Sequence, residues 1–114
     1  MCNREFFGKC RKGSYFINTS RGELVDDEAL LEALENGTIA MAGLDTLDHE
    51  PVQKDHPMLS WPREILDRIV FSPHIGGITG SSFRRGYGMI WDDIEKVAKG
   101  EVPGHIVNWK ELEQ

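Results

Sequence analysis

The sequence predicts an α/β fold in which helices flank a parallel sheet of about three strands. Apolar runs that suit buried strands alternate along the chain with segments whose apolar residues have helical spacing. Each of these runs also ends in a short polar segment, as strands do at the edge where parallel sheets bind ligands. At 114 residues, the chain has the length of one ordinary domain.

The first expected elements are a short helix and a strand. Asn3 can cap a helix that continues to about Lys12, and Gly13 ends it. Residues 14–18 include aromatic and β-branched side chains and predict the first strand. The chain is then expected to turn at Arg21-Gly22.

The second helix and the strand after it are strongly indicated. Asp26 is a good N-cap, acidic residues follow it, and Asn36-Gly37 signals the end of the helix. Its buried face is expected to consist of Ala29, Leu30, Leu31, Ala33 and Leu34. The continuous apolar run at residues 39–44 predicts a strand that is covered on both faces, as in parallel sheets.

A loop, a third strand and a long helix complete the expected order. Residues 45–62 are rich in Asp, His and Pro and predict a structured loop, whose length suggests a function. Residues 68–72 predict the third strand. An amphipathic helix is expected from near Ser81 to Gly100, weakened by two internal glycines by about 1 kcal/mol each.

Composition and charge exclude several classes of function. The net charge is −6 and the basic residues are scattered, which argues against a nucleic-acid surface. No apolar stretch approaches the ~20 residues that a membrane span requires, and a cytoplasmic location is the default expectation. Cys2 and Cys10 are too few for a disulfide framework or a structural zinc site, and reduced thiols are expected.

Three side chains at expected strand ends have the chemistry of an acid/base site. Arg21 can hold a carboxylate through two parallel hydrogen bonds, or it can pair on the surface with a nearby acidic residue, Glu23 or Asp26. His74 and Glu50 can form a general acid/base pair. The alternative is a histidine satisfied locally in a turn, with the glutamate in water.

Further candidates lie beside these residues. Asp45 can accept a hydrogen bond from an amide of a bound cofactor, or it can cap the following turn. Gly76-Gly77 allows a ligand to approach the backbone closely, although a tight turn would also explain it. A metal site is the competing interpretation of His49, Glu50, His56 and His74. None of their spacings matches the common helical zinc signature, so no metal is expected.

Taken together, these segments resemble the D-isomer-specific 2-hydroxyacid dehydrogenases, which include 3-phosphoglycerate, glycerate and D-lactate dehydrogenases. The matching segments are residues 12–26, 29–37, 42–45, 50–51, 56–57 and 72–77. The resemblance implies a partial Rossmann-like sheet and NAD as cofactor, with NADP as the alternative. It also implies hydride transfer between the nicotinamide and C2 of a small 2-hydroxy or 2-oxo acid.

The resemblance assigns a role to each candidate residue. Arg21 would bind the substrate, His74 would be the acid/base and Glu50 its partner. Asp45 would hold the nicotinamide carboxamide. The residues implied to line the cofactor site are Thr19, Ser20, Arg21, Asp45, His74, Gly76 and Gly77.

The chain also departs from the family. It has no G-x-G-x-x-G between a strand and a helix; residues 86–91 begin similarly but lie within a helical pattern. Residues 1–102 therefore correspond to the C-terminal part of an NAD-binding domain, and 103–114 to a segment that returns toward a substrate domain. We expect the isolated chain to be catalytically silent. The alternatives are an inactive remnant or interaction module, which could self-associate through a sheet edge or a family dimer interface, and a fragment of a longer gene product.

Overall fold

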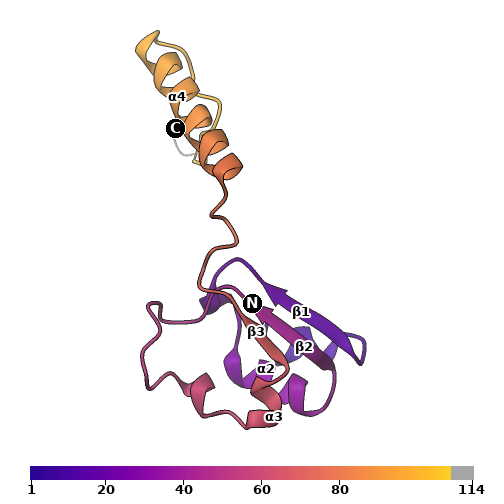
Figure 1. The fold of residues 1–114 in the computed structure, drawn as a ribbon. Helices are drawn as coiled ribbons and strands as arrows, with labels where there is room; N and C mark the ends of the chain where they lie inside the picture. The colour runs from indigo at the N-terminus through magenta and orange to yellow at the C-terminus, as the bar shows by residue number, and fades with distance from the viewer. Residues whose placement is uncertain (109–114) are drawn as a thin grey trace. The chain divides into compact units, whose positions relative to one another are not determined.

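The computed structural model describes residues 1–108, which fall into two compact units (Figure 1). The first unit is Met1–Gly76, and the second begins at Gly77. All three strands belong to the first unit, and the second contains one long helix.

A parallel sheet organises the first unit. Its strands are β1 (Ser14–Asn18), β2 (Ile39–Leu44) and β3 (Ile69–Phe71), in the order β1-β2-β3. Asn18 pairs with Leu44, and Leu44 pairs with Phe71, so the carboxyl ends of the three strands lie level with one another. The predicted three-stranded parallel sheet is confirmed, and β3 is shorter than the predicted residues 68–72.

The first two helices begin where the sequence places them. In α1 (Arg4–Gly8) the Asn3 side chain accepts a hydrogen bond from the Phe6 N–H, and in α2 (Asp27–Glu35) Asp26 accepts from the Ala29 N–H. The predicted extension of α1 to about Lys12 is wrong. Gly8 is a poor helix former, and the chain closes after it in tight turns before β1 enters the sheet.

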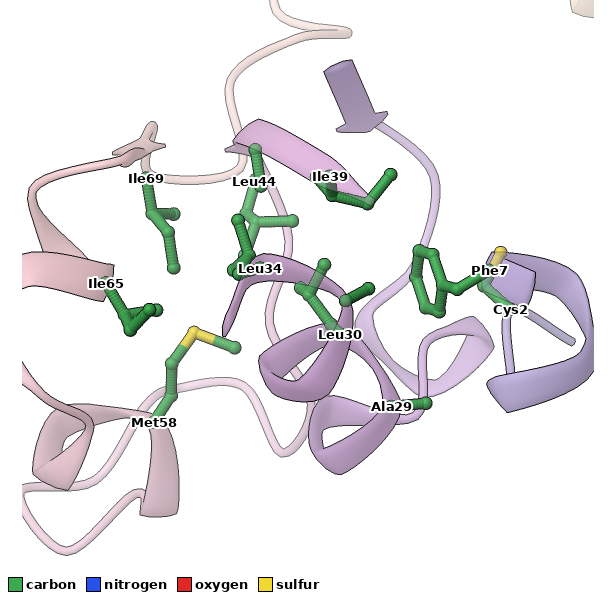
Figure 2. Close-up of a cluster of buried hydrophobic side chains, with 12 residues drawn as sticks. Cys2, Phe7, Ala29, Leu30, Leu34, Ile39, Leu44, Met58, Ile65 and Ile69 are labelled. Atoms are coloured by element: carbon green, nitrogen blue, oxygen red, sulfur yellow. The ribbon is translucent and has the colours of Figure 1, made fainter. Parts of the chain in front are cut away.

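The core lies between one face of the sheet and the helices (Figure 2). Its most deeply buried side chains are Leu30, Leu34, Ile39 and Met58. On the other face, Met41 of β2 is 37% exposed, so the expectation that residues 39–44 are covered on both faces is wrong for this unit. Tyr15, Ile17 and Val70 of the two neighbouring strands are 71%, 72% and 63% exposed. The reason is that both crossovers, β1 to β2 and β2 to β3, bring their helices to the same face.

The predicted loop after β2 contains regular structure that the sequence pattern did not predict. A 3-10 helix, η2 (Pro57–Ser60), buries Met58, and a one-turn helix, α3 (Arg63–Leu66), buries Ile65. Both side chains join the core beneath the sheet. The loop is thereby fixed at one end to the core while its first part, from Asp45, remains at the strand ends.

The second unit is built on α4 (Gly80–Ala98), which begins at a Thr79–Ser82 capping box. The predicted long helix is confirmed, and no residue of it is buried. Asp93 accepts hydrogen bonds from the Gly104 N–H (2.7 Å) and from His105 Nδ1 (2.9 Å). These contacts fix the segment after the helix to the side of α4. Residues 109–114 of the predicted return segment lie outside the described residues.

Over residues 1–108, no helix is both long and apolar enough to cross a membrane. The same residues contain no group of three or more His, Cys, Asp or Glu side chains arranged to hold a metal ion.

Candidate functional site

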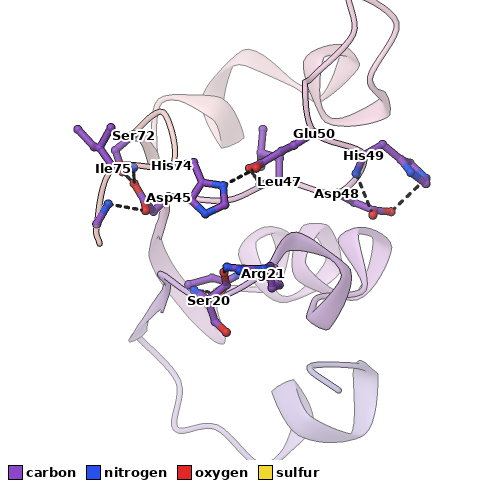
Figure 3. Close-up of polar contacts among 12 residues, drawn as sticks. Ser20, Arg21, Asp45, Leu47, Asp48, His49, Glu50, Ser72, His74 and Ile75 are labelled. Carbon is purple, nitrogen blue, oxygen red and sulfur yellow. Dashed lines mark hydrogen bonds and ion pairs between the residues drawn. The ribbon is translucent and has the colours of Figure 1, made fainter. Parts of the chain in front are cut away.

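The carboxyl edge of the sheet brings together the segments that follow the three strands (Figure 3). Arg21 follows β1, Asp45 follows β2 directly with Glu50 a few residues later, and His74 follows β3. The level strand ends are the reason that these residues, which are far apart in sequence, reach one region of the first unit.

His74 and Glu50 form a hydrogen-bonded pair. His74 Nδ1 lies 2.5 Å from Glu50 Oε2, and the Leu47 N–H donates to Glu50 Oε1 at 2.9 Å. The Leu47 N–H, the His74 contact and the nearby charge of Arg21 lower the pKa of Glu50 below its usual range. Glu50 is therefore a carboxylate near neutral pH and can only accept, so the proton of this hydrogen bond lies on His74 Nδ1. Within residues 1–108, Nε2 makes no hydrogen bond.

Asp45 is enclosed by the segment that carries His74. Its Oδ1 accepts hydrogen bonds from Ser72 Oγ (2.5 Å) and the Ile75 N–H (3.0 Å), and its Oδ2 accepts from the Gly76 N–H (2.8 Å). The Ser72 hydroxyl and the two backbone N–H groups lower the pKa of Asp45, although its burial acts in the opposite direction. Within residues 1–108 none of these hydrogen bonds goes to the turn that directly follows Asp45, so the alternative that Asp45 caps that turn is wrong. Its side chain binds the segment after β3 instead.

Arg21 stands on a turn that Asn18 shapes. The Asn18 side chain donates to the Arg21 carbonyl (2.8 Å) and accepts from the Ser20 N–H (3.0 Å). The Arg21 guanidinium donates to the Ser20 carbonyl at 2.7 Å. Within residues 1–108 it forms no ion pair with either Glu23 or Asp26, the surface partners that the sequence left open.

Gly22 lets this turn pack against the loop that carries Glu50. A Cβ at Gly22 would lie 2.0 Å from the Leu47 carbonyl carbon and 2.2 Å from the Asp48 nitrogen, so only glycine fits. Because the turn and the loop touch here, the charge of Arg21 is close enough to lower the pKa of Glu50. Sequence reasoning missed Asn18, Gly22 and Ser72 as residues that shape the site, although each one lies within two residues of a predicted site residue.

A largely apolar hollow of about 830 Å³ borders the histidine–glutamate pair. Its lining includes Glu50 and His74 together with Val52, Leu59, Phe71 and Pro73. Thr19, Ser20 and Arg21 do not contribute to this lining, so the hollow meets the pair from another side. The arrangement can hold an apolar group beside a proton-transfer pair.

Known proteins are similar to this chain over most of its length. The family model described as "D-isomer specific 2-hydroxyacid dehydrogenase, NAD binding domain" matches residues 1–76. A glyoxylate reductase of Thermofilum pendens is 38% identical over 108 residues, which cover 95% of this chain and 30% of that protein.

Two crystal structures with bound nucleotides are also similar. One is a D-isomer-specific 2-hydroxyacid dehydrogenase from Lactobacillus delbrueckii ssp. bulgaricus in an NAD-complexed form, with 36% identity and a TM-score of 0.69 over 95% of this chain and 35% of that one. The other, from Xanthobacter autotrophicus Py2 in complex with NADPH and MES, has 31% identity and a TM-score of 0.70 over 93% of this chain and 40% of that one. The chain thus spans about a third of the length of the relatives that it matches.

Proposed function

Because the chain belongs to the D-isomer-specific 2-hydroxyacid dehydrogenase family, in its NAD-binding domain, we propose that it carries the acid/base edge of a nicotinamide-dependent oxidoreductase. The substrate class is a small 2-hydroxy or 2-oxo acid, as the name of the glyoxylate reductase relative suggests. The observation that carries the proposal is the 2.5 Å contact between His74 Nδ1 and Glu50 Oε2 at the carboxyl edge of the sheet.

His74 is the proposed acid/base. Its Nδ1–H is held by the Glu50 carboxylate, so Nε2 exchanges the proton of the substrate's C2 oxygen. When the substrate is reduced, Nε2–H donates to the developing alkoxide, and Glu50 stabilises the imidazolium that precedes this step. When the substrate is oxidised, the neutral Nε2 accepts the hydroxyl proton.

Arg21 is the proposed substrate-binding cation. A planar guanidinium can form two parallel hydrogen bonds to a carboxylate, and its positive charge polarises a neighbouring carbonyl. Among residues 1–108 the guanidinium donates to the Ser20 carbonyl alone, and an incoming carboxylate can replace this acceptor. Arg21 thus also places a positive charge near the acid/base pair.

The strand ends fit a nicotinamide cofactor in two respects. Gly76 leaves the backbone beside Asp45 without a side chain, and the Asp45 carboxylate has acceptor capacity beyond its three contacts. When bound, the nicotinamide ring supplies or takes up the hydride at C2 of the acid. The residues proposed to hold NAD, or alternatively NADP, are Thr19, Ser20, Arg21, Asp45, His74, Gly76 and Gly77.

The activity of these 114 residues on their own is a separate part of the proposal. The chain contains no G-x-G-x-x-G turn between a strand and a helix, and that turn supplies much of the pyrophosphate affinity in such folds. We assign residues 1–102 to the NAD-binding domain and 103–114 to a return toward a substrate domain. The isolated chain should therefore give no turnover with NADH and glyoxylate, and measurable turnover would contradict this part.

A chimera tests the catalytic assignment directly. The matched 108-residue stretch of the Thermofilum pendens glyoxylate reductase is replaced by the corresponding residues of this chain. The chimera should reduce glyoxylate with NADH or NADPH, and His74→Asn should lower kcat by about 100-fold or more because general acid catalysis is lost.

His49→Asn is the matched control for this experiment. His49 lies on the same loop as Glu50, but its side chain is 88% exposed and contacts Asp48 rather than the site. It should leave kcat unchanged. A folded, active chimera in which His74→Asn behaves like His49→Asn would overturn the assignment of His74 as the acid/base.

An interaction module is the second candidate function, favoured by the exposed apolar face of the sheet. Tyr15, Ile17 and Val70 are all more than 60% exposed there, at 71%, 72% and 63%. Self-association through this face or through a sheet edge would give a dimer in size-exclusion chromatography with light scattering. A monodisperse monomer at high concentration would count against this candidate.

A further inference from the structure

The backbone of His74 adopts a conformation that requires support from its surroundings. Its φ of +54° lies in the left-handed region, which residues with a side chain seldom occupy. Such a conformation persists where neighbouring groups over-determine it. The groups that hold His74 therefore also control its contact with Glu50.

Asp45 supplies that support on both sides of His74. Its main-chain carbonyl accepts the His74 N–H at 2.8 Å. Its carboxylate accepts the Ser72 hydroxyl before the histidine, and the Ile75 and Gly76 N–H groups after it (Figure 3). One residue thus binds the segment at four points, within two residues of His74 in either direction.

Gly76 is matched to this arrangement. A Cβ at Gly76 would lie 2.9 Å from Asp45 Oδ2, which is closer than real Cβ atoms approach. At Gly77 a Cβ would meet nothing within 4 Å. The adjacent glycines therefore differ. Gly76 has to lack a side chain for the Asp45 carboxylate to accept its N–H, whereas Gly77 does not.

We infer that Asp45 is a positioning residue for His74, which it holds in contact with Glu50 through the Ser72–Gly76 segment. The inference rests on the proposed function of His74 and extends the role of Asp45 beyond cofactor binding. An ionised carboxylate offers about four acceptor sites, and the segment uses three of them. The remaining site, on Oδ2, is available to a cofactor amide, so both roles fit on one side chain.

Nuclear magnetic resonance of the unliganded 114-residue chain tests the inference without any cofactor. The ¹⁵N shifts of the His74 imidazole report whether Nδ1 carries the proton, and the ¹³C titration of Glu50 reports its contact with His74. In the wild-type chain Nδ1 should be protonated, and Glu50 should titrate below the usual glutamate value of 4.5.

The variants Asp45→Asn, Ser72→Ala and Gly76→Ala should each weaken the contact. The Nδ1–H signal should broaden through exchange, and the titration midpoint of Glu50 should rise toward its usual value. Ser72→Thr keeps the hydroxyl and should restore the wild-type signals, while Gly77→Ala should leave them unchanged. If Asp45→Asn does not fold, the two milder variants decide the result.

Unchanged His74 and Glu50 signals in folded Ser72→Ala and Gly76→Ala chains would overturn the positioning role. This outcome is distinguishable from failure of the proposed function. The first is read from an unliganded histidine, whereas the second would appear as full kcat in the His74→Asn chimera.

Discussion

At the scale of single residues, the site depends on side chains and glycines that border the reactive groups. Asn18 shapes the turn that carries Arg21, and Ser72 binds the carboxylate that anchors the segment of His74. These neighbours do no chemistry in the proposed mechanism. They determine the direction in which the chemical groups point.

Gly22 provides the sharpest test at this scale. Gly22→Ala should destabilise the first unit by about 3 kcal/mol, because the added methyl group would overlap the Leu47 and Asp48 backbone. Urea unfolding followed by circular dichroism measures the change. Gly8→Ala is the control, since its Cβ would meet nothing within 4 Å and the stability should change by less than about 1 kcal/mol.

A stability of Gly22→Ala equal to that of Gly8→Ala would show that the Arg21 turn does not pack on the Glu50 loop. Arg21 would then be free of the constraint that brings its charge close to Glu50.

At the scale of elements, apolar patterns predicted the three strands and the longer helices, and they failed for the short helices. The continuous apolar run at Ile39–Leu44 and the capped leucine-rich α2 are both found as predicted. The four-residue α3 was missed, because a single turn is too short to display a helical period. The pattern from Phe6 to Cys10 overextended α1, because periodicity does not register the weakness that Gly8 introduces.

Helix α4 carries a prediction that concerns the element alone. A methyl group added at either of its internal glycines, Gly86 or Gly88, would meet nothing within 4 Å, so alanine there adds helix propensity without a clash. Each Gly→Ala change should stabilise α4 by about 1 kcal/mol.

The measurement is the helical circular dichroism signal during thermal unfolding. The temperature at which the helical signal is lost should be higher in Gly86→Ala and Gly88→Ala than in the wild type, and higher still in the double variant. A fall in helical signal would indicate that the two positions need a glycine for a contact outside α4.

At the scale of the whole molecule, the protein has two compact units, and the proposed acid/base pair lies within the first. The family model covers the same residues, 1–76, as that unit. Net charge acts at this scale as well: 19 acidic residues against 13 lysines and arginines make the stability sensitive to the state of the carboxyl groups.

Acid should destabilise the first unit through Glu50. Because folding lowers its pKa, the stability that Glu50 contributes is present above its usual value of 4.5 and is lost as pH falls through the lower folded value. The lowered pKa of Asp45 acts in the same direction, whereas burial raises the pKa of Asp27 and makes it act oppositely.

Glu50→Gln isolates the first of these contributions. The difference in urea midpoint between wild type and Glu50→Gln should be largest above about pH 5 and should shrink below about pH 4. Methyl resonances of Leu30 and Leu34 follow the core of the first unit. Glu35→Gln, at the exposed end of α2, removes the same charge without breaking a contact of the site. A pH-independent difference for Glu50→Gln would contradict the lowered pKa.

The sequence by itself determined the order of the main elements, the parallel sheet and the identity of the polar residues at its carboxyl edge. It could do so because strand runs, helix caps and residue types at strand ends are local patterns along the chain. Only the tertiary structure decided that Asp45 binds the segment of His74 and that Gly22 packs against the loop of Glu50. It also decided that one face of the sheet is exposed. The first two features are contacts between residues 25 to 31 positions apart, and the third depends on the face to which the crossovers bring their helices. All three depend on strand register and helix placement rather than on any neighbouring residue.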